Sequence, residues 1–120
     1  MNYIRNNNLI GIKAGKERDT FLEIWMVVVD DRIFARSWGM AEKSWYNTLK
    51  ENSQGFLKCG NKIFEMKAII PVQSAALTEK INKAYLDKYD SGENSFYAKG
   101  IIKQEHVAKT MEFELLPIIS

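Results

Sequence analysis

The segment FLEIWMVVVDDRIFARSW, residues 21–38, decides the fold that the sequence predicts. Its first half, Phe21–Val29, is rich in aromatic and β-branched residues, which favour β-strands. Asp30-Asp31 then predicts a hairpin turn, because aspartate tolerates the backbone of tight turns, and Arg32–Trp38 follows as the returning strand. Apolar residues occupy both faces of Phe21–Val29, apart from Glu23. We therefore expect both faces to be covered, either by a barrel interior and a helix or by a second subunit.

The chain around this hairpin predicts further strands and two helices. Strands are expected where β-branched or alternating apolar residues lie between turn residues, and helices where apolar residues recur at helical spacing after a capping serine. The expected strands are Leu9–Ala14, Phe56–Cys59, Lys62–Ile70 and Thr110–Leu116, and the expected helices are Trp45–Asn52 and Ala75–Tyr89. Residues 95–110 are ambiguous. The order predicts one mainly β (α+β) domain over residues 1–120, with six antiparallel strands in a small closed or split barrel; a four- or five-stranded sheet is the alternative.

Composition and charge exclude several classes of protein. The 120 residues carry 17 basic and 15 acidic side chains, a net charge of +2, so neither a nucleic acid nor a membrane is expected as partner. Cys59 is the only cysteine, which excludes an internal disulfide and the usual Cys/His zinc site. The longest apolar run, near Ile24–Val29, is far shorter than the ~20 residues that span a bilayer. No signal-peptide pattern opens the sequence, and we expect a cytoplasmic protein.

Arg36-Ser37-Trp38, at the end of the predicted hairpin, is the first candidate binding site. In the functional interpretation, Arg36 holds a phosphate or carboxylate, Ser37 adds a hydroxyl and Trp38 flanks a planar ring, because a guanidinium matches such anions with two hydrogen bonds. In the structural interpretation, Arg36 lies at a barrel rim and pairs with Glu23 or Glu65. Strand alternation places Arg36 on the face of Trp38 and opposite to Ser37.

Two further segments could contact an anion. Lys43-Ser44-Trp45-Tyr46 begins a short helix, whose free N–H groups and partial positive charge favour an anion, with Lys43 and Tyr46 as added donors. In the structural interpretation, Ser44 only caps the helix, and Trp45 packs with Leu49 one turn later. The loop Gly15–Arg18 supplies Lys16 and Arg18, which could equally belong to a solvated loop.

The sequence contains no recognisable catalytic or metal-binding motif. Cys59 is expected to be an inert, buried thiol, because a reactive thiol needs a base or a positive field, and the only histidine lies in the ambiguous segment 95–110. His106 is the only histidine, and no spacing typical of metal ligands surrounds it. Four aromatic residues flank the polar segment Asp90–Asn94: Tyr85, Tyr89, Phe96 and Tyr97. They could cover a ligand as a lid, but a subunit contact or packing is favoured.

Three stretches together carry a resemblance to a known family. RIFARSW, then SWYNTLKEN, then GFLKCGNKIFEMKAI follow one another as in an uncharacterised bacterial domain family, over roughly residues 9 to 117. That family in turn resembles the deazaflavin-dependent nitroreductases, in which a Gly/Lys/Arg-rich turn precedes the central hairpin. The corresponding turn here, Gly15–Arg18, contains Glu17, is followed by Asp19 and lacks the second glycine of that pattern.

The resemblance implies a split barrel of the flavin-reductase and pyridoxamine-phosphate-oxidase type. Such proteins are usually homodimers that bind a flavin such as FMN, or a deazaflavin, in a groove between the subunits. No metal is expected for this chain, because its sequence lacks the spacing of metal ligands. On this chain, the residues that would hold the small, planar, anionic ligand are Arg36, Ser37, Trp38, Lys43, Ser44, Tyr46, Lys16 and Arg18. The sequence therefore predicts either an oxidoreductase that works through a bound flavin, or a non-catalytic ligand-binding or interaction module on the same fold.

Overall fold

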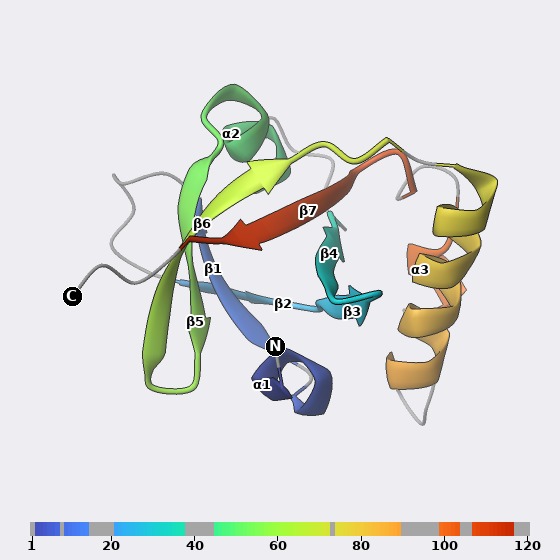
Figure 1. Cartoon of the computed structure of the whole chain (residues 1–120), viewed down its shortest axis with the longest axis horizontal. Helices are drawn as coiled ribbons and strands as arrows, with labels where there is room; N and C mark the ends of the chain where they lie inside the picture. Colours follow the sequence, from blue (N-terminus) through green and yellow to red (C-terminus); the bar gives the residue numbers. More distant parts are fainter. Residues whose placement is uncertain are drawn as a thin grey trace.

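A curled antiparallel sheet of seven strands forms the body of the molecule (Figure 1). The computed structural model describes residues 2–7, 9–14, 21–37, 45–72, 74–89, 99–103 and 107–116. The elements are α1 (Asn2–Asn6), β1 (Ile10–Ala14), β2 (Leu22–Ile24), β3 (Val27–Val29), β4 (Arg32–Arg36), α2 (Trp45–Glu51), β5 (Gln54–Cys59), β6 (Lys62–Ile69), α3 (Ala75–Tyr89) and β7 (Thr110–Leu115). The strand order is β2-β1-β5-β6-β7-β4-β3, and every neighbouring pair is antiparallel.

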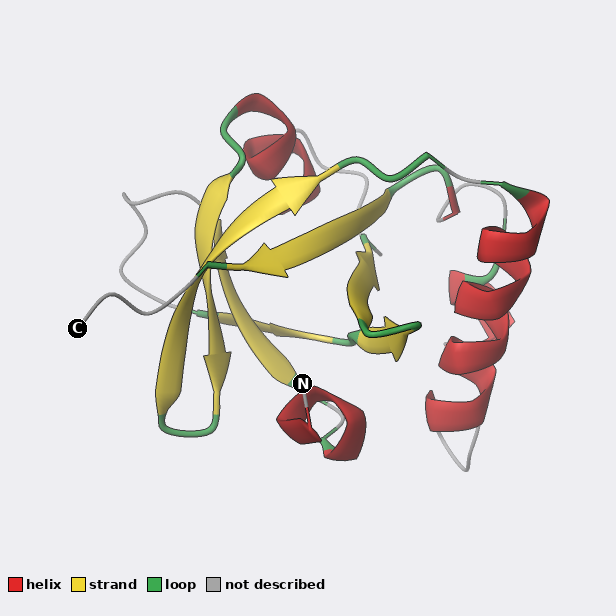
Figure 2. Ribbon diagram, in the orientation of Figure 1, coloured by secondary structure: helices red, strands yellow, loops and turns green. Residues whose placement is uncertain are grey.

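The predicted strand Phe21–Val29 is two strands, which is why the sheet has seven strands and the prediction of six is wrong. β2 pairs with β1 and β3 pairs with β4, at opposite edges of the sheet. Only Trp25 and Met26 separate them in the sequence. Because two residues join the first strand of the sheet to the last, the sheet must curl until its edges approach each other, as the ribbon shows (Figure 2).

The prediction that both faces of Phe21–Val29 are covered is confirmed for β3 and wrong for β2, where Leu22 is 49% exposed. In the β3–β4 hairpin the cover is a barrel interior and a helix. On one face, Ile33 and Ala35 belong to the core inside the curled sheet. On the other face, Val27 and Phe34 pack against α3, which lies outside the sheet (Figure 1). A second subunit is therefore not needed to explain this apolar pattern, and dimerisation stays a prediction.

The break between β2 and β3 leaves backbone groups that side chains of α3 bond. The N–H of Met26 donates to the hydroxyl of Tyr89 at 3.0 Å, and the carbonyl of Met26 accepts from the same hydroxyl and from the ammonium of Lys88. The N–H of Arg36, beyond the end of the β3–β4 ladder, donates to the hydroxyl of Tyr85 at 2.8 Å. Buried peptide groups need such partners, so α3 replaces the missing strand neighbour.

Turns and helices follow the sequence closely, with few exceptions. Asp30 and Asp31 have φ angles of 51° and 60°, as the two central residues of a type I′ hairpin turn require. Gly60, in the predicted β5–β6 turn, has a φ of 65°. α3 spans the predicted residues, whereas α1 was not predicted. None of the described helices is long and apolar enough to cross a membrane.

Candidate functional site

Arg36 is buried where the end of β4 meets α3. Its side chain contacts α3, and the residue is 3% exposed. Its Nε donates to the hydroxyl of Thr110 at 3.1 Å, and its Nη1 donates to the side-chain carbonyl of Asn82 at 2.5 Å and to the backbone carbonyl of Ile101 at 3.4 Å. The guanidinium carbon lies 5.6 Å from the ring centre of Tyr85. We call these five residues the Arg36 cluster.

The charge of Arg36 has no acidic partner in the described part of the chain. The pairing with Glu23 or Glu65 that the structural interpretation offered does not occur, and Nη2 is buried without any hydrogen-bond partner. Burial lowers the pKa of Arg36 below its ordinary value, although an arginine stays charged at neutral pH. An unpaired buried charge is unfavourable, so the cluster contains a free donor that an anion would satisfy.

The turn before β7 brings three predicted site residues together. Arg36 bonds Thr110, the backbone N–H of Ser37 donates to the carbonyl of Lys109 at 3.1 Å, and the hydroxyl of Tyr46 donates to the carbonyl of Ala108 at 3.4 Å. Residues 107–110 belong to the stretch that the sequence left unassigned. The structure thus identifies the segment around which Arg36, Ser37 and Tyr46 gather.

The remaining predicted binding residues lie outside the described residues: Lys16, Arg18, Trp38, Lys43 and Ser44. His106 also lies outside them. Trp45 and Leu49 are both buried in the core inside the sheet, which confirms the packing interpretation of this pair. Tyr46 is buried as well, and burial raises the pKa of its hydroxyl.

Sequence reasoning missed three members of the Arg36 cluster: Asn82, Ile101 and Thr110. Tyr85 and Tyr89 were predicted to cover a ligand, to form a subunit contact or to pack within the protein. Both tyrosines are fully buried between α3 and the sheet, so the lid interpretation is wrong for them. Phe96 and Tyr97 lie outside the described residues.

Cys59 and the acidic residues supply no second reactive centre among the residues described. Cys59 is half-buried at the end of β5, and burial raises its pKa, which keeps the thiol protonated at neutral pH. Within the described ranges, no group of three or more His, Cys, Asp or Glu side chains is placed to hold a metal ion.

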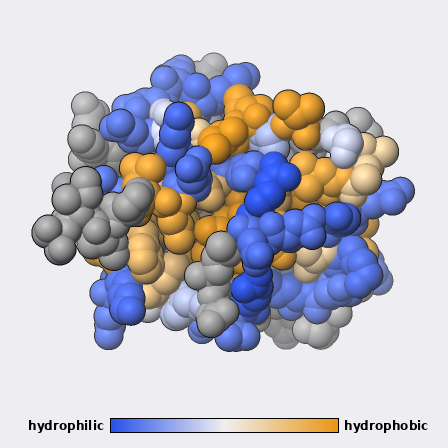
Figure 3. Space-filling view, in the orientation of Figure 1, coloured by the Kyte–Doolittle hydropathy of each residue, from blue (hydrophilic) through white to orange (hydrophobic). Residues whose placement is uncertain are grey.

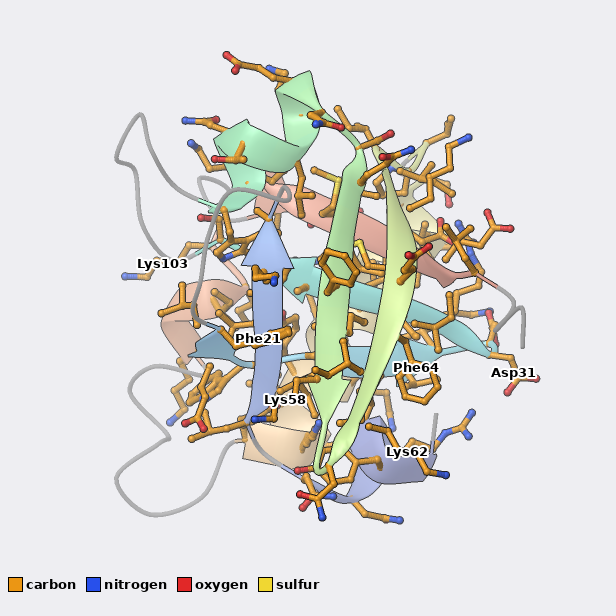
Figure 4. The ribbon with its side chains drawn as sticks, turned by 90° about the vertical axis from the view of Figure 1, so that its left-hand side faces the viewer. Phe21, Asp31, Lys58, Lys62, Phe64 and Lys103 are labelled. Atoms are coloured by element: carbon orange, nitrogen blue, oxygen red, sulfur yellow. The ribbon has the colours of Figure 1, made fainter. Side chains whose placement is uncertain are left out.

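The outer face of β1, β5 and β6 carries aromatic rings covered by lysines. Phe21 and Lys58 lie on this face, which no helix covers in the view of Figure 4. The ammonium of Lys13 lies 5.4 Å from the ring centre of Phe21 and 4.8 Å from that of Phe56, and Lys58 also approaches Phe21. These rings therefore have cationic partners of their own chain. On the view of Figure 3, hydrophobic residues reach the surface in patches between hydrophilic ones.

Two solved structures have a similar fold. A conserved hypothetical protein, Rv2991 from Mycobacterium tuberculosis, matches with a TM-score of 0.62 and 13% identity, over 96% of this chain and 76% of its own. HutZ, the heme storage protein from Vibrio cholerae, matches with a TM-score of 0.59 and 11% identity, over 99% of this chain and 87% of its own. At such identities the likeness concerns the fold alone, which is split-barrel-like.

Comparison by sequence gives a family. No curated protein matches the chain. Residues 4–113 match DUF2255, whose description is "uncharacterized protein conserved in bacteria". The match includes the β3–β4 hairpin, α3 and most of β7, and with them the Arg36 cluster. The chain therefore belongs to the bacterial family DUF2255.

Proposed function

We propose that the protein binds a small anionic ligand, and that the phosphate or carboxylate of this ligand contacts Nη2 of Arg36. One observation carries the proposal: a buried guanidinium with a free donor and no acidic partner among the described residues. A buried charge is stabilised when its hydrogen bonds are completed by an opposite charge, and guanidinium groups suit phosphates and carboxylates.

FMN, a deazaflavin and haem share the required chemistry, because each carries a phosphate or carboxylates on a planar ring system. The free nitrogen of Arg36 fits such an anionic group. The described residues contain no histidine to ligate a haem iron. A bound flavin would supply the redox chemistry. The chain would hold the anionic group through Arg36 and fix that side chain through Thr110 and Asn82.

Entry of a ligand requires some separation of the groups around Arg36. The side chain is enclosed by α3, β4 and the turn before β7, and the residue is 3% exposed. Binding that needs a structural change is slower than binding to an open site. The proposal therefore includes slow association, well below the ~10⁵ M⁻¹s⁻¹ typical of open protein surfaces.

The test compares ligands that differ by one anionic group. Purified protein is titrated by calorimetry with FMN, riboflavin, a deazaflavin mononucleotide, haem and inorganic phosphate. We expect FMN to bind at least about tenfold more tightly than riboflavin, because a charge-assisted hydrogen bond contributes roughly 1.5 kcal/mol or more. Equal affinities for FMN and riboflavin, or no binding of any of the five compounds, would contradict the proposal.

A matched pair of variants locates the contact. Arg36→Met removes the charge while keeping a long side chain. We expect the folded protein to be equally or more stable, as when other buried charges are replaced. We also expect this variant to lose the preference for FMN over riboflavin. Arg32→Met is the control, because Arg32 lies on the same strand and pairs at the surface with Glu112 at 2.7 Å. If Arg32→Met abolishes the preference and Arg36→Met keeps it, the site is elsewhere.

A further inference from the structure

A groove separate from the Arg36 cluster lies along the free edge of β3. It is a pocket of about 350 Å³, lined by Arg5, Val27, Val28, Ala84, Asp87 and Lys88. Neighbouring residues of a strand point to opposite faces of the sheet. Because both Val27 and Val28 line the pocket, it must lie beside the strand and not on one face. α1 contributes Arg5 on one side, and α3 contributes the other three residues.

The backbone of Val28 faces this groove. Val29 and Arg32 flank the two-residue turn, so they form a hydrogen-bonded pair of the hairpin. Hydrogen-bonded and non-hydrogen-bonded pairs alternate along an antiparallel ladder, so Val27–Phe34 is the next hydrogen-bonded pair. Alternation then turns the N–H and C=O of Val28 away from β4, toward the edge where the sheet ends. Among the described residues, no hydrogen bond from outside the hairpin reaches the backbone of Val28.

Met26 is the next residue whose backbone groups point outward, and it shows how this protein hydrogen-bonds such groups. The N–H and C=O of Met26 are bonded by Tyr89 and Lys88 of α3. One step along, at Val28, α3 presents the small side chain of Ala84 and leaves the pocket open. The groove therefore offers one donor and one acceptor of a strand edge, which are what an extended amide can pair with.

Two cationic groups line the same groove. The guanidinium of Arg5 donates to Asp31 at 2.8 Å, with its side chain 44% exposed, and it has further N–H donors. The ammonium of Lys88 donates to the carbonyls of Ile4 and Met26, which leaves one of its three donors. Asp87 is the only acidic group among the lining residues, and Lys83 pairs with it at 2.8 Å.

We propose that this groove binds an amide joined to a carboxylate, as at the carboxyl end of a peptide or in an N-acyl amino acid. The ligand amide pairs with the backbone of Val28, and the carboxylate contacts Arg5 and Lys88. Val27, Val28 and Ala84 receive a small apolar side chain. A volume of about 350 Å³ is at the small end for ligand sites, which limits the ligand to one or two residues.

The ligand side of the test uses N-acetylvaline, its neutral N-methylamide and isovalerate, followed by amide chemical shifts in NMR spectra. We expect N-acetylvaline to shift the amide signals of Val28 and Ala84. Both other compounds should bind at least tenfold more weakly, because each lacks one of the two groups. Equal binding of N-acetylvaline and its N-methylamide, or shifts confined to other regions, would overturn the proposal. An acetylated tripeptide ending in valine distinguishes the sources, since tighter binding identifies a peptide end and equal binding a small acyl amino acid.

Variants test the groove independently of the Arg36 cluster. Arg5→Gln should weaken the binding of N-acetylvaline about tenfold. Its matched control is Asp31→Asn, which breaks the same Arg5–Asp31 ion pair but keeps the guanidinium, and which should bind at least as well as the original protein. Ala84→Met should fill the groove and abolish binding with little change in melting temperature. An equal loss in Arg5→Gln and Asp31→Asn, or full binding by Ala84→Met, would refute the site, whereas Arg36→Met should leave it unchanged.

Discussion

The inside of the curled sheet and the seam between α3 and the hairpin are both buried, but they are built differently. The inside is apolar and is filled from nearly every strand and from α2. The seam contains two tyrosines whose hydroxyls bond the backbone, and it continues into the buried polar residues Arg36, Ser37 and Thr110. Apolar packing thus holds the strands together, and polar contacts complete the sheet where a strand is missing.

The two regions are stabilised by different interactions. Inside the sheet, strand neighbours already satisfy the backbone, so side chains contribute by burial alone. At the seam, backbone groups lie beyond the ends of their ladders, and each side-chain bond replaces a strand partner. Variants in the two regions should therefore differ in how much they lower the free energy of unfolding, and in how that free energy changes with pH.

The largest effect is expected inside the sheet. Leu57 is fully buried there, and Leu57→Ala should lower the free energy of unfolding by about 3 kcal/mol, from lost burial and the cavity left behind. The measurement is urea denaturation followed by tryptophan fluorescence. Ile63→Ala is the control, because Ile63 is 53% exposed on the neighbouring strand. Similar losses in both variants would contradict the assignment of Leu57 to the core.

A smaller effect is expected at the seam. Tyr85→Phe removes the hydroxyl that accepts the N–H of Arg36 and leaves that buried donor without its partner. The cost should be about 1 to 2 kcal/mol, again from urea denaturation. Hydrogen exchange of the Arg36 amide separates this cause from general loosening, since it should speed up more than that of Phe34. Equal acceleration at both amides would mean that the hydroxyl does not act as a strand substitute.

The smallest effect is a dependence on pH that arises at the seam. Burial lowers the pKa of Lys88 to about 8 from its ordinary 10.5. Between these values the unfolded chain holds a proton that the folded chain has released, so the free energy of unfolding should rise with pH. We expect a rise of about 1 kcal/mol from pH 8 to 9.5, less than the full shift implies because the side chain is only half-buried.

The same region sets the upper limit of this rise. Burial raises the pKa values of Tyr85 and Tyr89 well above their ordinary 10. Above about pH 10 the unfolded tyrosines lose protons that the folded ones keep, so stability should fall again. Lys88→Met should abolish the rise below pH 9.5 and keep the fall, as measured by denaturation at each pH. A rise that persists in Lys88→Met would assign it to another group.

Much of the architecture was predictable, because local patterns determine it. The capping Ser74 and the apolar spacing gave α3, and Asp30-Asp31 gave the hairpin turn. The break at Trp25–Met26 was not predictable, since nothing in the run of apolar residues marks it. It depends on which distant strand pairs with each half, and that information is not local.

The candidate site was predictable only in part for the same reason. Arg36 was identifiable as a charged residue in an apolar strand, and Tyr46 as a polar residue in a helix start. Their common neighbour, the turn before β7, is about 60 to 75 residues away in the sequence. Asn82 lies on α3 beside the apolar stripe that identified the helix. No pattern in the sequence linked Asn82 to Arg36.

The two-residue link between β2 and β3 also fixes the girth of the barrel. In an open sheet, another strand can be added at either edge without disturbing the rest. Here Trp25 and Met26 join the first strand of the sheet to the last. The length of this link therefore limits how far apart the two edges of the sheet can lie. A longer link at this point would remove the covalent constraint that keeps the two edge strands close together.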